Sequence, residues 1–229
     1  MPHARLLPRL PRRSPQPNLH PAKLELIDLA FRDYGCRTFA DLGGVWHVDG
    51  GYSLHALRHA DRGVLVDTGA DNLTDRARNE NRLRLIRGDF TDPAHATQVG
   101  EVDIVFHFDT LLHQYEPDWR ETLALYSSQT RAFLVCQPQW TGSKTIRLPT
   151  LGSDEYHRLI TPPGKQPTSD SLALVETDPG SRRIWQWAIT LTDLTTEMQR
   201  LGFRLYLFRN WGSWNGLERF ERHAATFMR

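Results

Sequence analysis

The segment FADLGGVWHVDGGYS, residues 39–53, follows an apolar run and precedes a helix-like stretch. Asp41 stands near its start, and its four glycines form two adjacent pairs at positions 43–44 and 50–51. A loop that binds a dinucleotide pyrophosphate needs the spacing G-x-G-x-x-G, so that backbone N–H groups can approach the phosphates. The spacing here is different, and the Asp41 carboxylate would repel a pyrophosphate. The segment therefore suits a ligand with a cationic amine better than a nicotinamide dinucleotide.

Apolar runs alternate with helix-like stretches on both sides of this segment. Strands are predicted at residues 37–44, 63–67, 83–90, 101–109 and 130–140, and helices at 22–35, 51–63, 72–82, 117–129 and 190–203. Runs that are apolar on both faces and joined by helical crossovers predict a parallel sheet covered by helices on both sides. Because such crossovers are right-handed, the sheet should be doubly wound.

The last thirty residues predict an antiparallel hairpin at the edge of this sheet. Two strand-like runs, 203–210 and 217–229, flank the turn WGSWNG. The expected fold is therefore α/β, with a doubly wound, mostly parallel seven-stranded sheet and a C-terminal antiparallel hairpin. Thr192 or Asp193 is the expected N-cap of the 190–203 helix. The run IWQWAIT is predicted as a strand with Trp185 and Trp187 on one face, either in the core or as an aromatic wall over a substrate.

The chain divides into a short arm and one domain. Residues 1–21 contain six prolines, four arginines and no acid, and they lack the apolar core of a secretory signal. They are expected to form a disordered, basic arm, and residues 22–229 a single domain. Residues 141–183 are rich in Pro, Gly, Ser and Thr and follow a strand's carboxyl end. Such a long insertion is typical of a lid over a substrate.

Composition excludes some classes of partner. The formal net charge is +1, which gives no general attraction to nucleic acid or acidic lipid. No window approaches the roughly 18 apolar residues of a membrane span. Cys36 and Cys136 lie far apart, and two buried thiols in a cytoplasmic protein explain them better than a disulfide. The sequence leaves open whether the chain forms a homodimer.

An acid closes each of the first four predicted strands. These acids are Asp41, Asp67, Asp89 and Asp109, and Phe90 follows the third. In an open parallel sheet, ligands bind outside the carboxyl ends of the strands. One such acid is unremarkable, since Asp is a common turn residue. Four in succession predict a binding site at this edge.

The order of these motifs resembles the S-adenosylmethionine-dependent methyltransferases of the Rossmann-like class. The resemblance covers residues 39–140 and rests on DLGG, VLVD, GDF and the acid that ends the fourth strand. It implies the cofactor S-adenosylmethionine and the product S-adenosylhomocysteine. The implied cofactor-binding residues are Asp41, Gly43 and Gly44 at the methionine moiety, Asp67 at the ribose, Asp89 and Phe90 at the adenine, and Asp109 lining the cofactor.

The first loop departs from the pattern of that family. The usual spacing is acid-x-Gly-x-Gly-x-Gly, whereas Val45 and His47 occupy the second and third glycine positions. This departure supports one alternative function, a catalytically degenerate protein of the same fold that binds a partner. A nicotinamide-dependent oxidoreductase is a weaker alternative because of the glycine spacing.

The acceptor should meet the cofactor near residues 108–119. His113 and Asp109 are the candidate catalytic residues, because an oxygen or nitrogen acceptor needs a base for its proton. Candidate acceptor-binding residues are Tyr115, Trp119, Gln137, Gln139 and Trp140. His107, Asp109 and His113 form no recognised metal signature, so no metal is expected. The predicted function is methyl transfer to an oxygen or nitrogen of a small molecule, either a natural product or a sugar-like acceptor.

Overall fold

The computed structural model describes residues 19–166 and 174–229. The predicted arm therefore lies outside the described residues, except for its last three positions. The last of these positions, Pro21, is the first residue of helix α1 (Pro21–Asp33). His20 is the N-cap of this helix, and its ring Nδ1 accepts a hydrogen bond from the backbone N–H of Ala22 at 3.1 Å.

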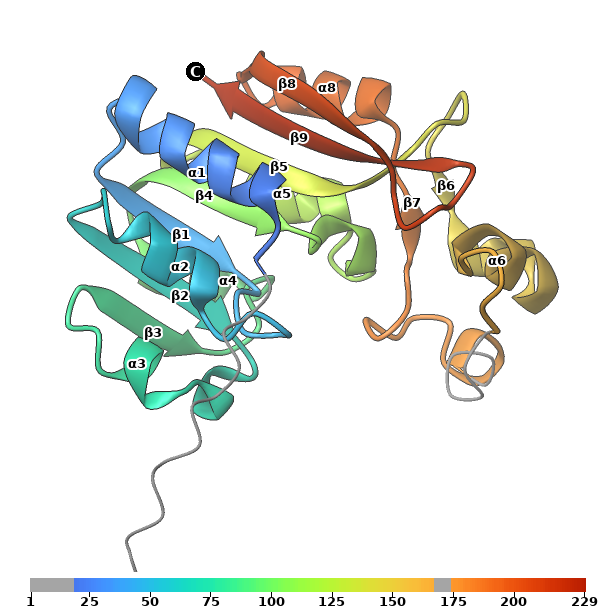
Figure 1. Cartoon of the computed structure of the whole chain (residues 1–229), viewed down its shortest axis with the longest axis horizontal. Coiled ribbons are helices and arrows are strands. Elements are labelled where there is room, and N and C mark those ends of the chain that lie inside the picture. Colours follow the sequence, from blue (N-terminus) through green and yellow to red (C-terminus); the bar gives the residue numbers. More distant parts are fainter. Residues whose placement is uncertain (1–18, 167–173) are drawn as a thin grey trace, which may run out of the picture.

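A seven-stranded sheet organises the domain (Figure 1). Its strand order is β3-β2-β1-β4-β5-β9-β8. The first five strands are parallel, whereas β9 is antiparallel to both β5 and β8. The strands are β1 (Thr38–Leu42), β2 (Arg62–Asp67), β3 (Leu83–Arg87), β4 (Val102–Phe108), β5 (Thr130–Trp140), β8 (Arg204–Ser213) and β9 (Phe220–Met228). The predicted fold class, with its edge hairpin, is confirmed.

Helices cover both faces of the sheet because alternate strand residues point to opposite sides. On β5, Leu134 and Cys136 face α1, whereas Phe133 and Val135 pack toward the other layer. One face carries α1, α2 (Gly51–Ala56) and α3 (Asp75–Arg78); the other carries α4 (Pro93–Val99), α5 (Trp119–Ser127) and α8 (Leu191–Arg200). Cys36 and Cys136 are both buried and free, as predicted.

The structure corrects several local predictions. Residues 72–82 contain only the four-residue α3, preceded by a 3₁₀ turn at Ala70–Asn72, and α4 was not predicted. Thr190 is the N-cap of α8, where its hydroxyl accepts from the Asp193 backbone N–H at 3.0 Å. It precedes the predicted cap residues because the helix begins two or three residues earlier than they imply.

The segment after β5 forms a small substructure of its own. It contains β6 (Ile146–Arg147), a 3₁₀ turn at Leu148–Leu151 and α6 (Ser153–Ile160), and β6 pairs with β7 (Trp187–Ala188). The predicted strand over 184–190 is thus reduced to two residues. These elements share a third hydrophobic cluster with Trp140 and Phe220. Among the described residues, no helix has the length and apolar character needed to cross a membrane.

Candidate functional site

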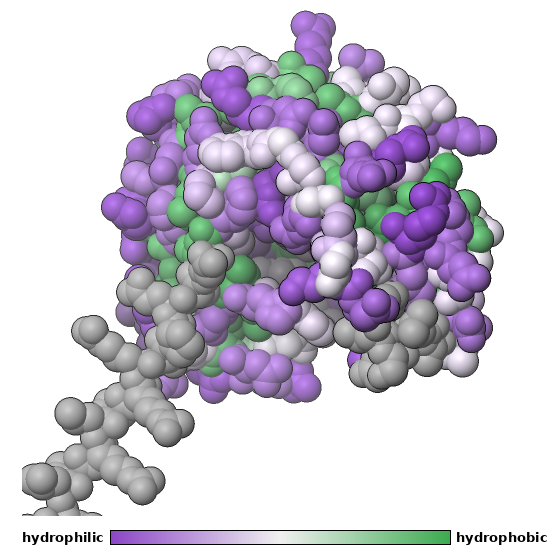
Figure 2. All heavy atoms as spheres, turned by 45° about the vertical axis from the view of Figure 1, so that its right-hand side comes forward, coloured by the Kyte–Doolittle hydropathy of each residue, from purple (hydrophilic) through white to green (hydrophobic). Residues whose placement is uncertain are grey.

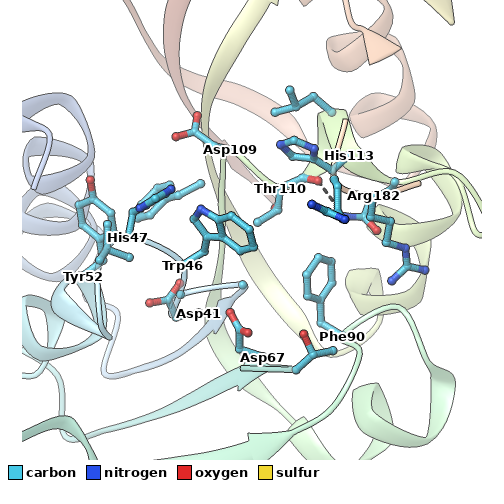
Figure 3. Close-up of a pocket in the computed structure, with 18 of the residues that line it drawn as sticks. Asp41, Trp46, His47, Tyr52, Asp67, Phe90, Asp109, Thr110, His113 and Arg182 are labelled. Atoms are coloured by element: carbon cyan, nitrogen blue, oxygen red, sulfur yellow. Dashed lines mark hydrogen bonds between the residues drawn. The ribbon is translucent and has the colours of Figure 1, made fainter. Parts of the chain in front are cut away.

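A cavity of about 640 Å³ opens at the carboxyl ends of the central strands. The space-filling view shows a recess on this side of the molecule, surrounded mainly by hydrophilic residues (Figure 2). Its walls come from the loop after β1, from the ends of β2, β3 and β4, and from Arg182, Arg183 and Trp185. Figure 3 shows the principal side chains. The four acids predicted at strand ends, Asp41, Asp67, Asp89 and Asp109, all line it.

Asp41 lies in the buried part of β1 and is almost completely shielded from solvent, with 1 % of its surface exposed. Its Oδ2 accepts a hydrogen bond from the Ser53 hydroxyl at 2.6 Å. Burial raises the pKa of Asp41 to about 6, although the Ser53 bond opposes the rise. Gly44 must be glycine here, because a Cβ at that position would collide with the Asp41 carboxylate. The loop is therefore built around a buried acid.

The departure from the family's glycine pattern produces a compact turn. The Gly50 N–H donates to the Gly44 carbonyl at 2.9 Å, and the Asp49 N–H donates to the Val45 carbonyl at 2.9 Å. His47 has a left-handed backbone, with φ of 60°. Trp46 is 73 % exposed and lines the cavity beside His47. These two side chains therefore border the cavity opening instead of packing into the core.

Asp67, at the end of β2, fixes this turn and also lines the cavity. Its Oδ2 accepts from the Val45 N–H at 3.0 Å, and its Oδ1 accepts from the Gly69 N–H at 2.7 Å. Each carboxylate oxygen has a second lone pair. The side chain can therefore still accept hydrogen bonds from a ligand that carries vicinal hydroxyls.

Asp89 links the sheet to the segment after β5. Its Oδ1 accepts from the Thr91 backbone N–H at 2.9 Å and the Thr91 hydroxyl at 2.8 Å, and its Oδ2 pairs with Arg182. Burial raises the pKa of Asp89, but the hydrogen bonds from Thr91 and Arg182 outweigh it and leave the pKa below its ordinary value. Arg182 also donates to the Glu116 carbonyl at 3.0 Å. The adjacent Phe90 side chain borders the same cavity.

Replacing Arg182 with methionine should loosen the segment without unfolding the domain. The Arg182–Asp89 pair is about one-third exposed on each side, and exposed pairs contribute about 0–1 kcal/mol. We expect faster proteolytic cleavage within residues 141–183 and little change in melting temperature. Arg158→Met is the matched control, since Arg158 pairs with Glu155 on its own helix, α6. Equal cleavage rates for both variants would contradict the role of Arg182 in holding the segment against the domain.

Asp109 carries a second ion pair in the cavity. Lys23, from α1, places its Nζ 2.5 Å from Asp109 Oδ2 and 5.1 Å from the centre of the Tyr52 ring. Burial lowers the pKa of Lys23, but Asp109 and Tyr52 outweigh this effect and raise it. Asp109 Oδ1 is buried and has no hydrogen-bond partner among the described residues. The ammonium group already neutralises this carboxylate, which weakens the case for Asp109 as a base.

His113 has the tautomer that a general base needs. It lies in a 3₁₀ turn after β4, Leu111–His113, and its Nδ1 is 2.9 Å from the Ile184 carbonyl. A carbonyl only accepts, so Nδ1 carries the proton and Nε2 holds a lone pair. Burial lowers the pKa of His113, and its bond to Ile184 only partly offsets this. The imidazole is therefore neutral near pH 7.

The same arrangement of strands occurs in solved methyltransferases. The chain aligns with 1,6-didemethyltoxoflavin-N1-methyltransferase from Burkholderia thailandensis at a TM-score of 0.60 and 13 % identity, covering 91 % of this chain and 78 % of that one. That enzyme was crystallised with 1,6-didemethyltoxoflavin and S-adenosylhomocysteine. The chain has the Rossmann-like methyltransferase fold. No protein-family model and no curated protein sequence matches it.

Two further enzymes share this methyltransferase fold. Magnesium protoporphyrin IX methyltransferase from Synechocystis, solved with S-adenosylmethionine, aligns at a TM-score of 0.55 and 12 % identity, covering 91 % of this chain and 80 % of that one. Mitomycin 7-O-methyltransferase aligns at a TM-score of 0.54 and 15 % identity, covering 91 % of this chain. The present chain spans about half, 53 %, of the mitomycin enzyme.

The five residues predicted to bind the acceptor do not line the cavity of this methyltransferase fold. Trp119 and Trp140 pack into hydrophobic clusters, and Gln137 and Gln139 are buried along β5. The Tyr115 ring lies 3.9 Å from the Arg147 guanidinium. The remaining cavity wall is instead formed by Leu112, Gln114, Pro138, Arg183, Trp185 and Trp214. His107 also lies away from the cavity, stacked on Phe133.

Among the cavity residues that were not predicted, Lys23 and Arg182 form ion pairs with two of the predicted acids. Lys23 is buried on the same face of α1 as Ile27 and Ala30. A lysine in register with an apolar helix stripe is a usable signal, because burying its charge requires a partner. Arg182 has no such signal, since its partner Asp89 lies 93 residues earlier in the chain.

Proposed function

We propose that the chain is an S-adenosylmethionine-dependent methyltransferase that acts on an oxygen or nitrogen of a small molecule. One observation carries the proposal: buried Asp41 and half-buried Asp67 line one cavity beside Gly43 and Gly44. An ammonium group would pair with the first acid, and vicinal hydroxyls would donate to the second. All three aligned enzymes described above are methyltransferases, and two of them were crystallised with S-adenosylmethionine or its product.

The residues present fit this cofactor. Gly43 has a φ of 81°, and a Cβ there would lie 2.8 Å from Thr110 Cγ2, so only glycine leaves this part of the wall open. Asp109 has one buried oxygen without a partner among the described residues. Lys23 replaces the missing glycines as a candidate partner for the cofactor's carboxylate. Asp89 and Phe90 would hold the adenine amino group and ring.

When bound, the cofactor supplies a methyl group on a sulfonium sulfur. His113 Nε2 would accept the proton that the acceptor's oxygen or nitrogen must lose. The Ile184 carbonyl holds the imidazole in the required tautomer. The segment from 141 to 183, tied down by Arg182, would exclude water from the reacting atoms. We assign His113 as the catalytic base and Asp109 as a residue that positions Lys23.

The remaining wall supports a planar acceptor with a negative charge. Trp185 and Trp214 lie 6.3 Å apart between ring centres, and both line the cavity. Arg183 is exposed at the same wall, and Arg222 lies over the Trp214 ring at 3.9 Å. No further acid lines this side among the described residues. Aromatic walls with cations suit an aromatic carboxylic acid that carries a hydroxyl or amino group.

We further propose a cytoplasmic location, since both buried thiols are free.

Val45 and His47 in the glycine positions support a second candidate, a binding protein that has lost catalysis. An assay with methyl-labelled S-adenosylmethionine and a panel of hydroxy- and amino-aromatic acids separates the two. Transfer to an acceptor supports the enzyme. Tight cofactor binding without transfer to any acceptor supports the binding protein, and light scattering then shows whether the ligand changes its oligomeric state.

A further inference from the structure

Three side chains converge outside the cavity, on the helices that cover one face of the sheet. Asp28 belongs to α1, His55 to α2, and His59 follows α2 by three residues. Asp28 Oδ1 lies 2.6 Å from His55 Nε2 and 3.2 Å from His59 Nε2. The three atoms all lie within 4.8 Å of one another. Helices α1 and α2 run side by side in Figure 1, so the cluster connects them.

The convergence requires a proton or a metal cation between the carboxylate oxygen and each imidazole nitrogen. A neutral imidazole nitrogen that presents its lone pair to a carboxylate oxygen at this distance is repelled. Each Nε2 must therefore carry a proton, or both must share a cation with the carboxylate. One divalent ion satisfies all three groups at once. Two imidazoles and a carboxylate are ligands that Zn²⁺ binds well, whereas Mg²⁺ and Ca²⁺ prefer oxygen ligands.

We propose that Asp28, His55 and His59 bind a Zn²⁺ ion. With Zn–ligand distances of about 2.0–2.2 Å, tetrahedral ligand atoms lie about 3.3–3.6 Å apart. The Asp28–His59 separation of 3.2 Å lies just below this range. The Asp28 and His59 side chains are 42 % and 43 % exposed, so they can rotate to widen the shorter Asp28–His55 contact. Water would complete the fourth position.

The ion would tie α1 to α2. Both helices also carry residues of the cavity wall: Lys23 lies on α1 and Tyr52 on α2. Metal binding should therefore stabilise the fold at the base of the cavity. The inference does not depend on methyl transfer, and Zn²⁺ binding can be measured without cofactor or acceptor.

The test is a titration of the metal-free full chain with Zn²⁺ against a chromophoric chelator, with melting temperature as a second readout. The principal variant is His59→Gln, because this side chain is 43 % exposed, pairs with Asp28 and lies edge-on to the His55 ring. Asp28→Asn is a second variant, which keeps the side-chain shape but removes the charge. His95→Gln is the matched control. His95 Nδ1 lies 3.7 Å from Asp92 Oδ2, but no third metal-ligating side chain of the described residues joins this pair.

We expect one Zn²⁺ per chain in the wild type and in His95→Gln, with a melting temperature several degrees higher when metal is bound. Loss of even an outer partner of a ligand costs about 10–100-fold in metal affinity. His59→Gln and Asp28→Asn should therefore each weaken binding by at least about tenfold. Equal affinity of the wild type and both variants, or no stoichiometric binding by the folded wild type, would overturn the proposal.

Discussion

Asp41→Asn should nearly abolish the binding of S-adenosylhomocysteine and yet make the free protein more stable. The substitution keeps an oxygen that can accept from Ser53, but it removes the charge that would pair with the ligand's ammonium group. Truncating one partner of a buried charge pair costs about 2–5 kcal/mol, which is roughly 30-fold to several-thousand-fold in affinity. The effect on stability has the opposite sign.

The gain in stability follows from the burial of Asp41. Its pKa is about 6 in the folded chain, against an ordinary value of 3.8. Between about pH 4 and pH 6 the folded state therefore retains a proton that the unfolded state has lost, and wild-type stability falls as pH rises through this window. Above pH 6, the full free-energy cost of burying the ionised Asp41 carboxylate remains, on the order of 2–3 kcal/mol. The asparagine variant avoids this cost.

The same titration predicts how affinity depends on pH in the wild type. A protonated Asp41 cannot pair with an ammonium group, so binding of S-adenosylhomocysteine should weaken as pH falls below about 6. Calorimetric titrations between pH 5 and pH 8, alongside urea unfolding, measure both effects. If the Asp41→Asn variant bound S-adenosylhomocysteine as tightly as the wild type, the proposed role of Asp41 would be ruled out.

Asp103→Asn is the matched control for this prediction. Asp103 lies at the opposite end of β4 from the cavity, where it accepts from the Arg37 and Thr38 backbone N–H groups and pairs with Arg131. Burial raises the pKa of Asp103, but these bonds outweigh it and lower the pKa. The stabilisation is therefore present above the ordinary pKa and is lost in acid. The control variant should be less stable at neutral pH and should bind the ligand normally.

His113→Gln should reduce kcat by about 100-fold or more, the usual contribution of a positioned general base. Glutamine fills a similar volume and can donate to the Ile184 carbonyl, but it has no basic nitrogen. In the wild type, kcat should fall as pH drops below the lowered pKa of His113, because only the neutral imidazole accepts a proton. The glutamine variant should lack this acidic limb.

Binding and rescue distinguish catalysis by His113 from a structural role. The glutamine variant should bind S-adenosylhomocysteine within a few-fold of the wild type. A His113→Ala variant should regain part of its activity when imidazole is added. If affinity and kcat fall together and imidazole restores nothing, His113 holds the structure of the site and is not its base.

The sheet and its acids were predictable because their signals are local. Each acid stands directly after an apolar run, and parallel strands bring their carboxyl ends to one edge. Asp41, Asp67, Asp89 and Asp109 therefore meet in one cavity, as the strand pattern implies. Asp41 is additionally marked by Gly44, whose missing side chain makes room for the carboxylate.

The rest of the cavity wall was harder to predict, because the direction of each side chain decides whether it lines the cavity. Gln137 and Gln139 lie near the carboxyl end of β5, at the edge of the sheet where the cavity opens. Because side chains alternate between the two faces along a strand, both glutamines are buried, and Pro138 between them lines the cavity. Trp119 begins a helix whose first turn faces the core. Arg182 arrives from a separate segment, and nothing in a local window indicates such a distant contact.

The central claim is that the cavity binds S-adenosylmethionine, and calorimetric titration of the wild-type chain with S-adenosylhomocysteine at pH 7.5 tests it most directly. The product is the better probe because it is stable and carries the same ammonium group, ribose and adenine. We predict one site per chain, with affinity strongly reduced in Asp67→Ala because the ribose hydroxyls lose their acceptor. A folded wild-type chain that binds neither S-adenosylhomocysteine nor S-adenosylmethionine would contradict the account.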